Sequence, residues 1–428
     1  MNSRLLKELP DLVNNDVISQ EVATNIETYY QSQDSNSPNR LFVVFGVLGS
    51  LLVGLGIILI LAHNWDNFSR SIKTLFAFLP LIIGQLSVAF SILKKKSKTW
   101  NEASGTFLFF TVGSSIALVS QIYNIPGNLS TYVLTWILLC APLIYLLKSN
   151  MLAILHLVFI TFYACEIGYS NYYSNETPWM YLALIAIVVP HYLQLLKYSR
   201  NDNITSIFNW LYPLSLTIVL GTFVKDYSEL GFLMYILLFS VFYNLGKIPF
   251  FDSQKLRKNG YLIFGSLGIV VLMLAMSFDS FWYVEQLVFF AQESYVSLVL
   301  FIVNVLILGF AYYKKWIKSF NLFQYVFILF SLLYLGGLNQ PVVGTIIVNI
   351  LILALGITTV KIGADKFHFG ILNYGLFIIT ALVVCRFFDT NMSFVIRGLL
   401  FVGVGLSFFL TNYIMLKKQK SKVEALKQ

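Results

Sequence analysis

The sequence predicts an all-α fold, a polytopic bundle of about fourteen membrane-spanning helices preceded by a short helical hairpin. Of the 428 residues, 57% are hydrophobic and only 11% are charged, whereas about a quarter of a soluble domain is charged. The apolar residues gather in segments of roughly 17–25 residues, the length that crosses a bilayer as a helix. Lysine and arginine alternate between abundant and scarce from one connecting loop to the next.

The polar residues 1–39 predict a small cytoplasmic hairpin of two helices followed by a linker. Apolar residues repeat at helical spacing before and after a turn at residues 14–16. Ser19 can cap the second helix, because its hydroxyl can accept a free backbone N–H of the first turn. So small a unit does not fold robustly alone. We therefore expect it to pack against the membrane domain or to bind a protein partner.

Residues 40–416 form the predicted membrane bundle, and residues 417–428 form a basic cytoplasmic tail. Each apolar segment is expected to be helical, because a helix satisfies its own backbone hydrogen bonds where water is absent. The predicted spans are residues 41–62, 72–93, 105–122, 131–147, 151–169, 179–196, 207–224, 231–246, 261–277, 295–313, 320–337, 341–360, 370–388 and 396–416.

The distribution of basic residues predicts that both termini are cytoplasmic. With the amino terminus inside, the cytoplasmic segments hold 24 basic residues and the opposite side holds 5. Those on the opposite side are Arg70, Lys73, Lys225, Arg386 and Arg397. Basic residues concentrate on the cytoplasmic side of membrane proteins. Missing or adding one span would reverse the side of every later loop and spoil this asymmetry, so the alternation also favours fourteen spans.

The net charge of +9 does not require a nucleic-acid partner. The cytoplasmic basic residues are spread over eight separate segments, so we expect no nucleic-acid binding. A basic inner face beside anionic headgroups is ordinary for membrane proteins, so the expected partner is the lipid bilayer. Cys140, Cys165 and Cys385 lie inside spans at unrelated spacings. They are expected to be small buried hydrophobic residues rather than a disulfide framework or a zinc site.

The charged residues inside the predicted spans do not indicate catalysis. Those that fall inside a span all lie within about a turn of its outer end; they are Lys73, Glu166, Arg386 and Arg397. Ionisable groups at membrane depth are costly and usually functional, so their absence there disfavours proton-coupled transport. Neutral groups such as Asn304, Asn349 or Gln85 leave other transport open.

Two histidines, His156 and His191, lie in adjacent spans toward the inner side. A metal site needs more ligands than this pair offers, so both are expected to be buried, hydrogen-bonded side chains. No serine, histidine and aspartate are held together by any motif. The sequence therefore predicts no catalytic residues, no cofactor and no metal.

Three polar motifs end predicted spans on the outer face. They contribute the candidate site residues His63, Asn64, Trp65, Asp66, Gln121, Tyr123, Asn124, Arg386 and Asp389. We hypothesise that they assemble into one polar site, in which Asp389 or Asp66 pairs with Arg386, since a charge at that depth needs a partner. The alternative is that each motif only caps and orients its own helix.

Several of these segments resemble a bacterial multi-pass membrane protein family, domain of unknown function 2157. The similar segments are the hairpin with VISQEVATNI, the stretch GLGIILILAHNWDNFSRSIK, the motif SQIYNIPGN and RFFD before the last span. His63 departs from the small residue expected before Asn64. The resemblance implies a cell-envelope membrane protein and brings no established activity, substrate or catalytic residues.

Together these features predict an integral protein of the bacterial inner membrane with a non-catalytic structural, sensory or assembly role in the cell envelope. The alternative is a transporter or lipid-handling protein with an outward-facing polar site. A transporter should show two related halves or discontinuous helices around a central polar cavity. A membrane-embedded enzyme is disfavoured, because no paired catalytic groups lie at membrane depth.

Overall fold

The computed structural model describes residues 9–34, 65–170, 176–282, 290–317, 321–337, 341–389 and 394–425. Within these ranges the regular secondary structure is entirely helical. The chain divides into two compact units, Met1–Phe76 and Ala77–Gln428. Each unit is described by itself.

The first unit contains the amino-terminal hairpin. Residues 9–14 are helical, and α2 (Gln20–Asp34) follows a turn in which Asp16 has a φ of 51°. Aspartate adopts this left-handed conformation more readily than most residues. The predicted cap of α2 is present, because the Ser19 hydroxyl accepts the backbone N–H of Val22 at 3.4 Å. Leu9 and Ala23 are buried.

The same unit also contains η1 (Trp65–Asn67) and the beginning of α4 (Arg70–Leu93). The Ser69 hydroxyl accepts the backbone N–H of Ile72 at 3.4 Å, as an N-cap does. The Lys73 ammonium lies 5.7 Å from the centre of the Trp65 ring, within the range of a cation–π contact.

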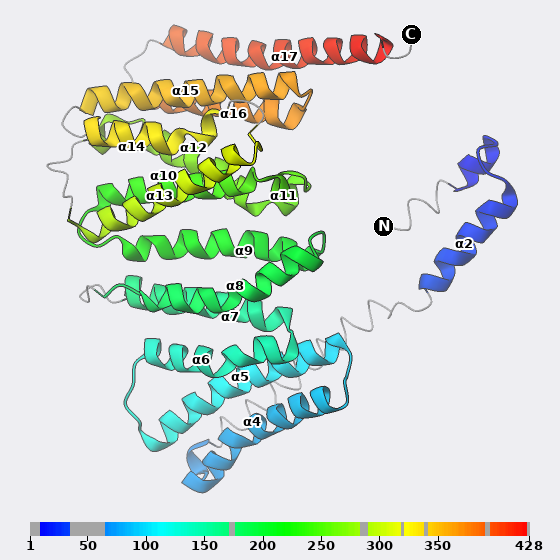
Figure 1. Ribbon diagram of the computed structural model, residues 1–428, viewed down its shortest axis with the longest axis vertical. Helices are drawn as coiled ribbons and strands as arrows, with labels where there is room; N and C mark the ends of the chain where they lie inside the picture. The colour runs from blue at the N-terminus through cyan, green and yellow to red at the C-terminus, as the bar shows by residue number, and fades with distance from the viewer. Residues whose placement is uncertain are drawn as a thin grey trace. The chain divides into compact units, whose positions relative to one another are not determined.

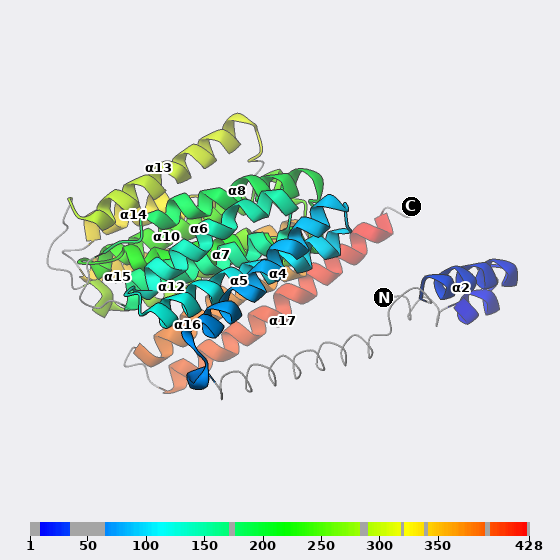
Figure 2. The ribbon, with the colours of Figure 1, turned by 90° about the horizontal axis from the view of Figure 1, so that it is seen from below.

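The second unit is a series of helices that run side by side (Figures 1 and 2). Two of them continue into short irregular turns: α7 ends in a π-helical segment, and α9 ends in a 3-10 turn. The elements that follow α4 are α5 (Lys98–Tyr123), α6 (Leu129–Leu147), α7 (Asn150–Cys165), η2 (Glu166–Ser170), α8 (Met180–Tyr198), α9 (Asn203–Leu220), η3 (Gly221–Phe223), α10 (Ser228–Gly246), α11 (Pro249–Asp252), η4 (Leu256–Lys258), α12 (Gly260–Ala275), η5 (Asp279–Trp282), α13 (Gln292–Tyr313), η6 (Leu322–Gln324), α14 (Val326–Gly337), α15 (Pro341–Asp365), α16 (Phe369–Asp389) and α17 (Phe394–Ala425).

The described residues include ten helices that are long and apolar enough to cross a membrane. Each overlaps one of the predicted spans. Three shorter apolar helices, Gly260–Ala275, Val326–Leu335 and Phe401–Ile414, overlap three more. The remaining predicted span, 41–62, lies outside the described residues. The chain is therefore an all-helical protein with several helices able to span a membrane, while the number fourteen and the sidedness stay predictions.

Helix α10 lies at the centre of the second unit, where it packs against α9, α12, α13 and α14. Most of its side chains are buried, and those of Met234, Ile236 and Ser240 are completely so. α12 approaches it closely, because a Cβ atom at Gly265 would lie 2.7 Å from the backbone oxygen of Phe239. Small residues permit such close approaches between membrane helices.

This close approach generates a prediction about packing. Gly265→Val should lower the thermal midpoint of the purified protein in detergent, because the new side chain collides with the backbone of α10. Overpacking of this kind costs about 1–3 kcal/mol. Gly309→Val is the matched control, since no described residue of another element comes within 4 Å of a Cβ built at Gly309. Equal midpoints for the two variants would contradict the packing of α10 against α12.

Candidate functional site

The first predicted motif is described only in part. Trp65 and Asp66 form the short helix η1, directly before the turn that starts α4. His63 and Asn64 lie outside the described residues. Because Trp65 and Asp66 belong to the first compact unit, a shared site with the other motifs stays a prediction.

The second motif ends α5. Asn124 has a φ of 52°, and the backbone N–H of Ile125 donates to the Ser120 carbonyl at 2.9 Å. A left-handed residue followed by such a backward hydrogen bond is a common helix C-terminus. Gln121 and Tyr123 are exposed in the last turn of the same helix. Here the motif residues terminate a helix.

The third motif ends α16 and includes Arg386. Its guanidinium donates to the Ser277 hydroxyl at 3.1 Å and lies 4.6 Å from the centre of the Phe278 ring. Ser277 also accepts, through its backbone oxygen, a hydrogen bond of 3.0 Å from the Asn349 amide. Arg386 therefore contacts the connection after α12. The Asp389 side chain lies outside the described residues, so its pairing with Arg386 stays a prediction.

The structure does not bring the Gln121 group and the Arg386 group together. α5 packs mainly on α6 and α7, whereas α16 packs on α12, α15 and α17. Figure 1 shows α7 to α10 standing between α5 and α16. Each of the two motifs contacts residues of its own part of the bundle.

A buried acidic group, which sequence reasoning missed, lies at the start of α13. Glu293 is completely buried, and its carboxylate accepts backbone N–H groups of Lys225 at 2.7 Å and Asp226 at 2.9 Å. The neighbouring Gln292 accepts from the Thr177 hydroxyl at 3.0 Å and donates to the Phe223 carbonyl at 3.2 Å. These contacts fasten three connections to one another. The only sequence signal was an acidic residue in the first turn of an apolar helix.

A comparable set of hydrogen bonds joins the amino-terminal ends of α5 and α7. The Glu102 carboxylate accepts the backbone N–H groups of Asn150 and Met151, each at 2.9 Å, and the hydroxyl of Ser149. The Asn150 side chain in turn lies 3.0 Å from the ring nitrogen Nε2 of His191. His191 is therefore a hydrogen-bonded bundle histidine.

His156 differs from that expectation. Its side chain is buried, and neither ring nitrogen has a hydrogen-bond partner among the described residues. Within the same ranges, no group of three or more His, Cys, Asp or Glu side chains is placed to hold a metal ion. The three cysteines are free thiols.

Two cavities in the second unit are large enough to consider as binding sites. An apolar groove of about 480 Å³ lies between α9, α10 and α12 and is lined by Trp210, Thr217, Phe232, Phe239, Phe264 and Leu267, among others. A polar pocket of about 290 Å³ lies where α10, α13 and α15 end. Neither cavity contains residues of the predicted outer-face site.

One family model matches the amino-terminal third of the chain. Residues 10–153 match the family described as predicted membrane protein (DUF2157). The DUF2157 match covers the hairpin from residue 10, the Asn-Trp-Asp motif and the SQIYNIPGN motif, and it confirms the resemblance over those residues. The RFFD motif lies beyond it. No curated protein matches the chain, and no solved structure does.

The Glu293 contacts predict how the connection around Lys225 resists proteases. Glu293→Ala should leave the backbone N–H groups of Lys225, Asp226 and Tyr227 without this acceptor. A lost acceptor costs about 1–3 kcal/mol, so trypsin should cleave after Lys225 faster. Asp279→Ala is the matched control, because Asp279 is an exposed carboxylate in the next connection. Equal cleavage rates in the two variants, measured by mass spectrometry, would show that Glu293 does not hold this connection.

Proposed function

We propose that this chain is a non-catalytic integral protein of the bacterial inner membrane, with a structural, sensory or assembly role in the cell envelope. It has fourteen spans, and both termini lie in the cytoplasm. The hairpin presents a binding surface to a protein partner, and the membrane bundle serves as its scaffold.

The observation that carries the proposal is how the bundle uses its interior polar groups. The Ser215 hydroxyl of α9 lies 2.6 Å from the Thr161 hydroxyl of α7 and 2.8 Å from the Tyr181 hydroxyl of α8. These groups are buried or half-buried and bind one another across three helices. Polar groups that satisfy one another fix neighbouring helices, as expected of a scaffold.

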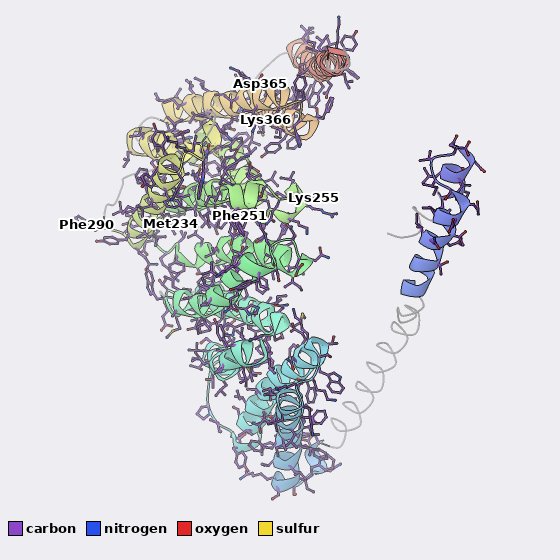
Figure 3. The ribbon with its side chains drawn as sticks, turned by 45° about the vertical axis from the view of Figure 1, so that its right-hand side comes forward. Met234, Phe251, Lys255, Phe290, Asp365 and Lys366 are labelled. Atoms are coloured by element: carbon purple, nitrogen blue, oxygen red, sulfur yellow. The ribbon has the colours of Figure 1, made fainter. Side chains whose placement is uncertain are left out.

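The sidedness is supported by the ends of the second unit. Figure 3 shows Lys255 and Lys366 at one end of the helices and Phe290 at the other. Lys255 and Lys366 belong to connections rich in basic residues, whereas the connection that contains Phe290 has none from residue 278 to residue 291. This arrangement agrees with basic loops gathered on the cytoplasmic face.

Lipid handling is the second candidate function, and the apolar groove favours it. The groove of about 480 Å³ is walled almost entirely by apolar atoms of α9, α10 and α12. An apolar groove of this kind can accept an acyl chain. The residues that line the groove would then contact the transported lipid.

A reconstitution experiment separates the two candidates. The full chain in liposomes should move neither fluorescent phospholipids between leaflets nor trapped solutes faster than protein-free liposomes do. Acceleration that is abolished by Gly268→Leu, which fills the groove floor beside Phe239, would replace the scaffold role with lipid handling.

The hairpin generates a further prediction. Val17 is 64% exposed and Val22 is 45% exposed, although both are apolar. Changing both to aspartate should abolish cross-linking of the hairpin to a protein partner in cells, because burying an unpaired charge at an interface is costly. Thr28→Asp, an exposed change on α2, is the control. Equal cross-linking in all three proteins would contradict the assigned binding surface.

A further inference from the structure

The polar pocket lies where α10, α13 and α15 end, on the side of the bundle that carries Lys255 and Lys366 (Figure 3). Its polar lining consists of Asn244, Lys247, Asp252, Ser253, Asn321, Gln324 and Lys366. Apolar side chains, among them Trp316 and Ile317, complete the wall. Its volume of about 290 Å³ is at the lower end of small-molecule sites, which span about 300–1,000 Å³.

A buried acceptor without a partner lies at this pocket. The Asn304 amide nitrogen donates to the Leu237 and Leu300 carbonyls, at 2.9 and 3.0 Å, so its oxygen must be the atom that faces Asn244. The Asn244 nitrogen donates to that oxygen at 3.3 Å and to the Gln324 carbonyl at 3.4 Å.

Both partners of the Asn244 nitrogen are acceptors, so the orientation of this amide is determined. Its oxygen Oδ1 is buried and has no hydrogen-bond partner among the described residues. The Asn244 side chain is only 3% exposed. A buried acceptor in this state costs free energy unless a donor reaches it, so a ligand there should carry an N–H or O–H group.

The charges of the pocket call for an anion on the same ligand. Lys247 pairs with Asp252 at 3.0 Å. Lys366 has no ion-pair partner among the described residues, so the described lining residues carry one uncompensated positive charge. Arg200 brings a second positive charge to the edge of the pocket, because its guanidinium donates to the hydroxyl of the lining residue Ser253. Lysine is a common ligand of phosphate groups.

We propose that this pocket binds a small phosphoester that also carries an N–H donor, of the phosphoethanolamine type. The phosphate lies at Lys366 and Lys247, and the ammonium donates to Asn244 Oδ1. A membrane lipid headgroup and a soluble phosphoester share this chemistry, and basic pockets between membrane helices do bind headgroups. The assignment goes beyond the proposed scaffold role and does not depend on it.

Phosphocholine supplies the decisive comparison, because its quaternary nitrogen has no N–H to donate while its phosphate and charge are the same. The full chain in a maltoside detergent is titrated with phosphoethanolamine and with phosphocholine, and the change in tryptophan fluorescence is followed. Trp316→Phe identifies the signal that comes from the pocket. Native mass spectrometry then compares retention of phosphatidylethanolamine and phosphatidylcholine.

The ethanolamine form should bind about tenfold more tightly or better, since a hydrogen bond to a charged group is worth that much. Lys366→Gln should weaken binding by a similar factor. Lys361→Gln, an exposed lysine on α15 outside the pocket, should leave it unchanged.

Binding of soluble phosphoethanolamine identifies a soluble ligand, and retention of the lipid alone identifies a headgroup; either supports the assignment. Equal affinity for the choline and ethanolamine forms, or binding that Lys366→Gln does not weaken, would overturn it.

Discussion

The fold depends on how buried amides are satisfied around α10. Inside a membrane no water is available to a free polar group, so a buried amide is stabilised by hydrogen bonds to its own helix and to neighbouring helices. Asn304 is such an amide: it is fully buried and binds the Leu237 carbonyl of α10, the Leu300 carbonyl of its own helix and the amide of Asn244. These bonds fix α13 against α10. They also leave the Asn244 oxygen as the one group of this network without a partner among the described residues.

Hydrogen bonds to buried or half-buried carboxylates also connect segments at both ends of the bundle. Glu102 lies near the start of α5, and Glu293 lies at the start of α13. Each carboxylate accepts two or more backbone N–H groups from a segment distant in sequence. Charge-assisted hydrogen bonds of this type are stronger than neutral ones. These two acidic residues thus help to hold connections in place between helices, which supports a rigid scaffold rather than a moving gate.

The apolar segments could be predicted from the sequence, because the hydrocarbon thickness sets the length of a spanning helix. All thirteen predicted spans beyond residue 64 coincide with helices of the structure. The partners of polar side chains could not be predicted in this way. The contacts of Arg386 with Ser277 and Phe278 had no signal in the sequence, and its predicted pairing with an aspartate stays a prediction. The sequence around Glu293 gave almost no indication that its carboxylate binds the connection around Lys225. Such contacts join residues far apart in the chain, and helical periodicity carries no information about which helices become neighbours.

The proposed scaffold role depends on the orientation of the chain in the membrane. This orientation is tested most directly by placing single cysteines in a protein whose Cys140, Cys165 and Cys385 have been changed to alanine. In intact bacterial cells, a membrane-impermeant maleimide should label Asp279→Cys, and it should label Lys255→Cys only after the membrane is permeabilised. Labelling of Lys255→Cys in intact cells would contradict the assigned sidedness, and the cytoplasmic position of the polar pocket with it.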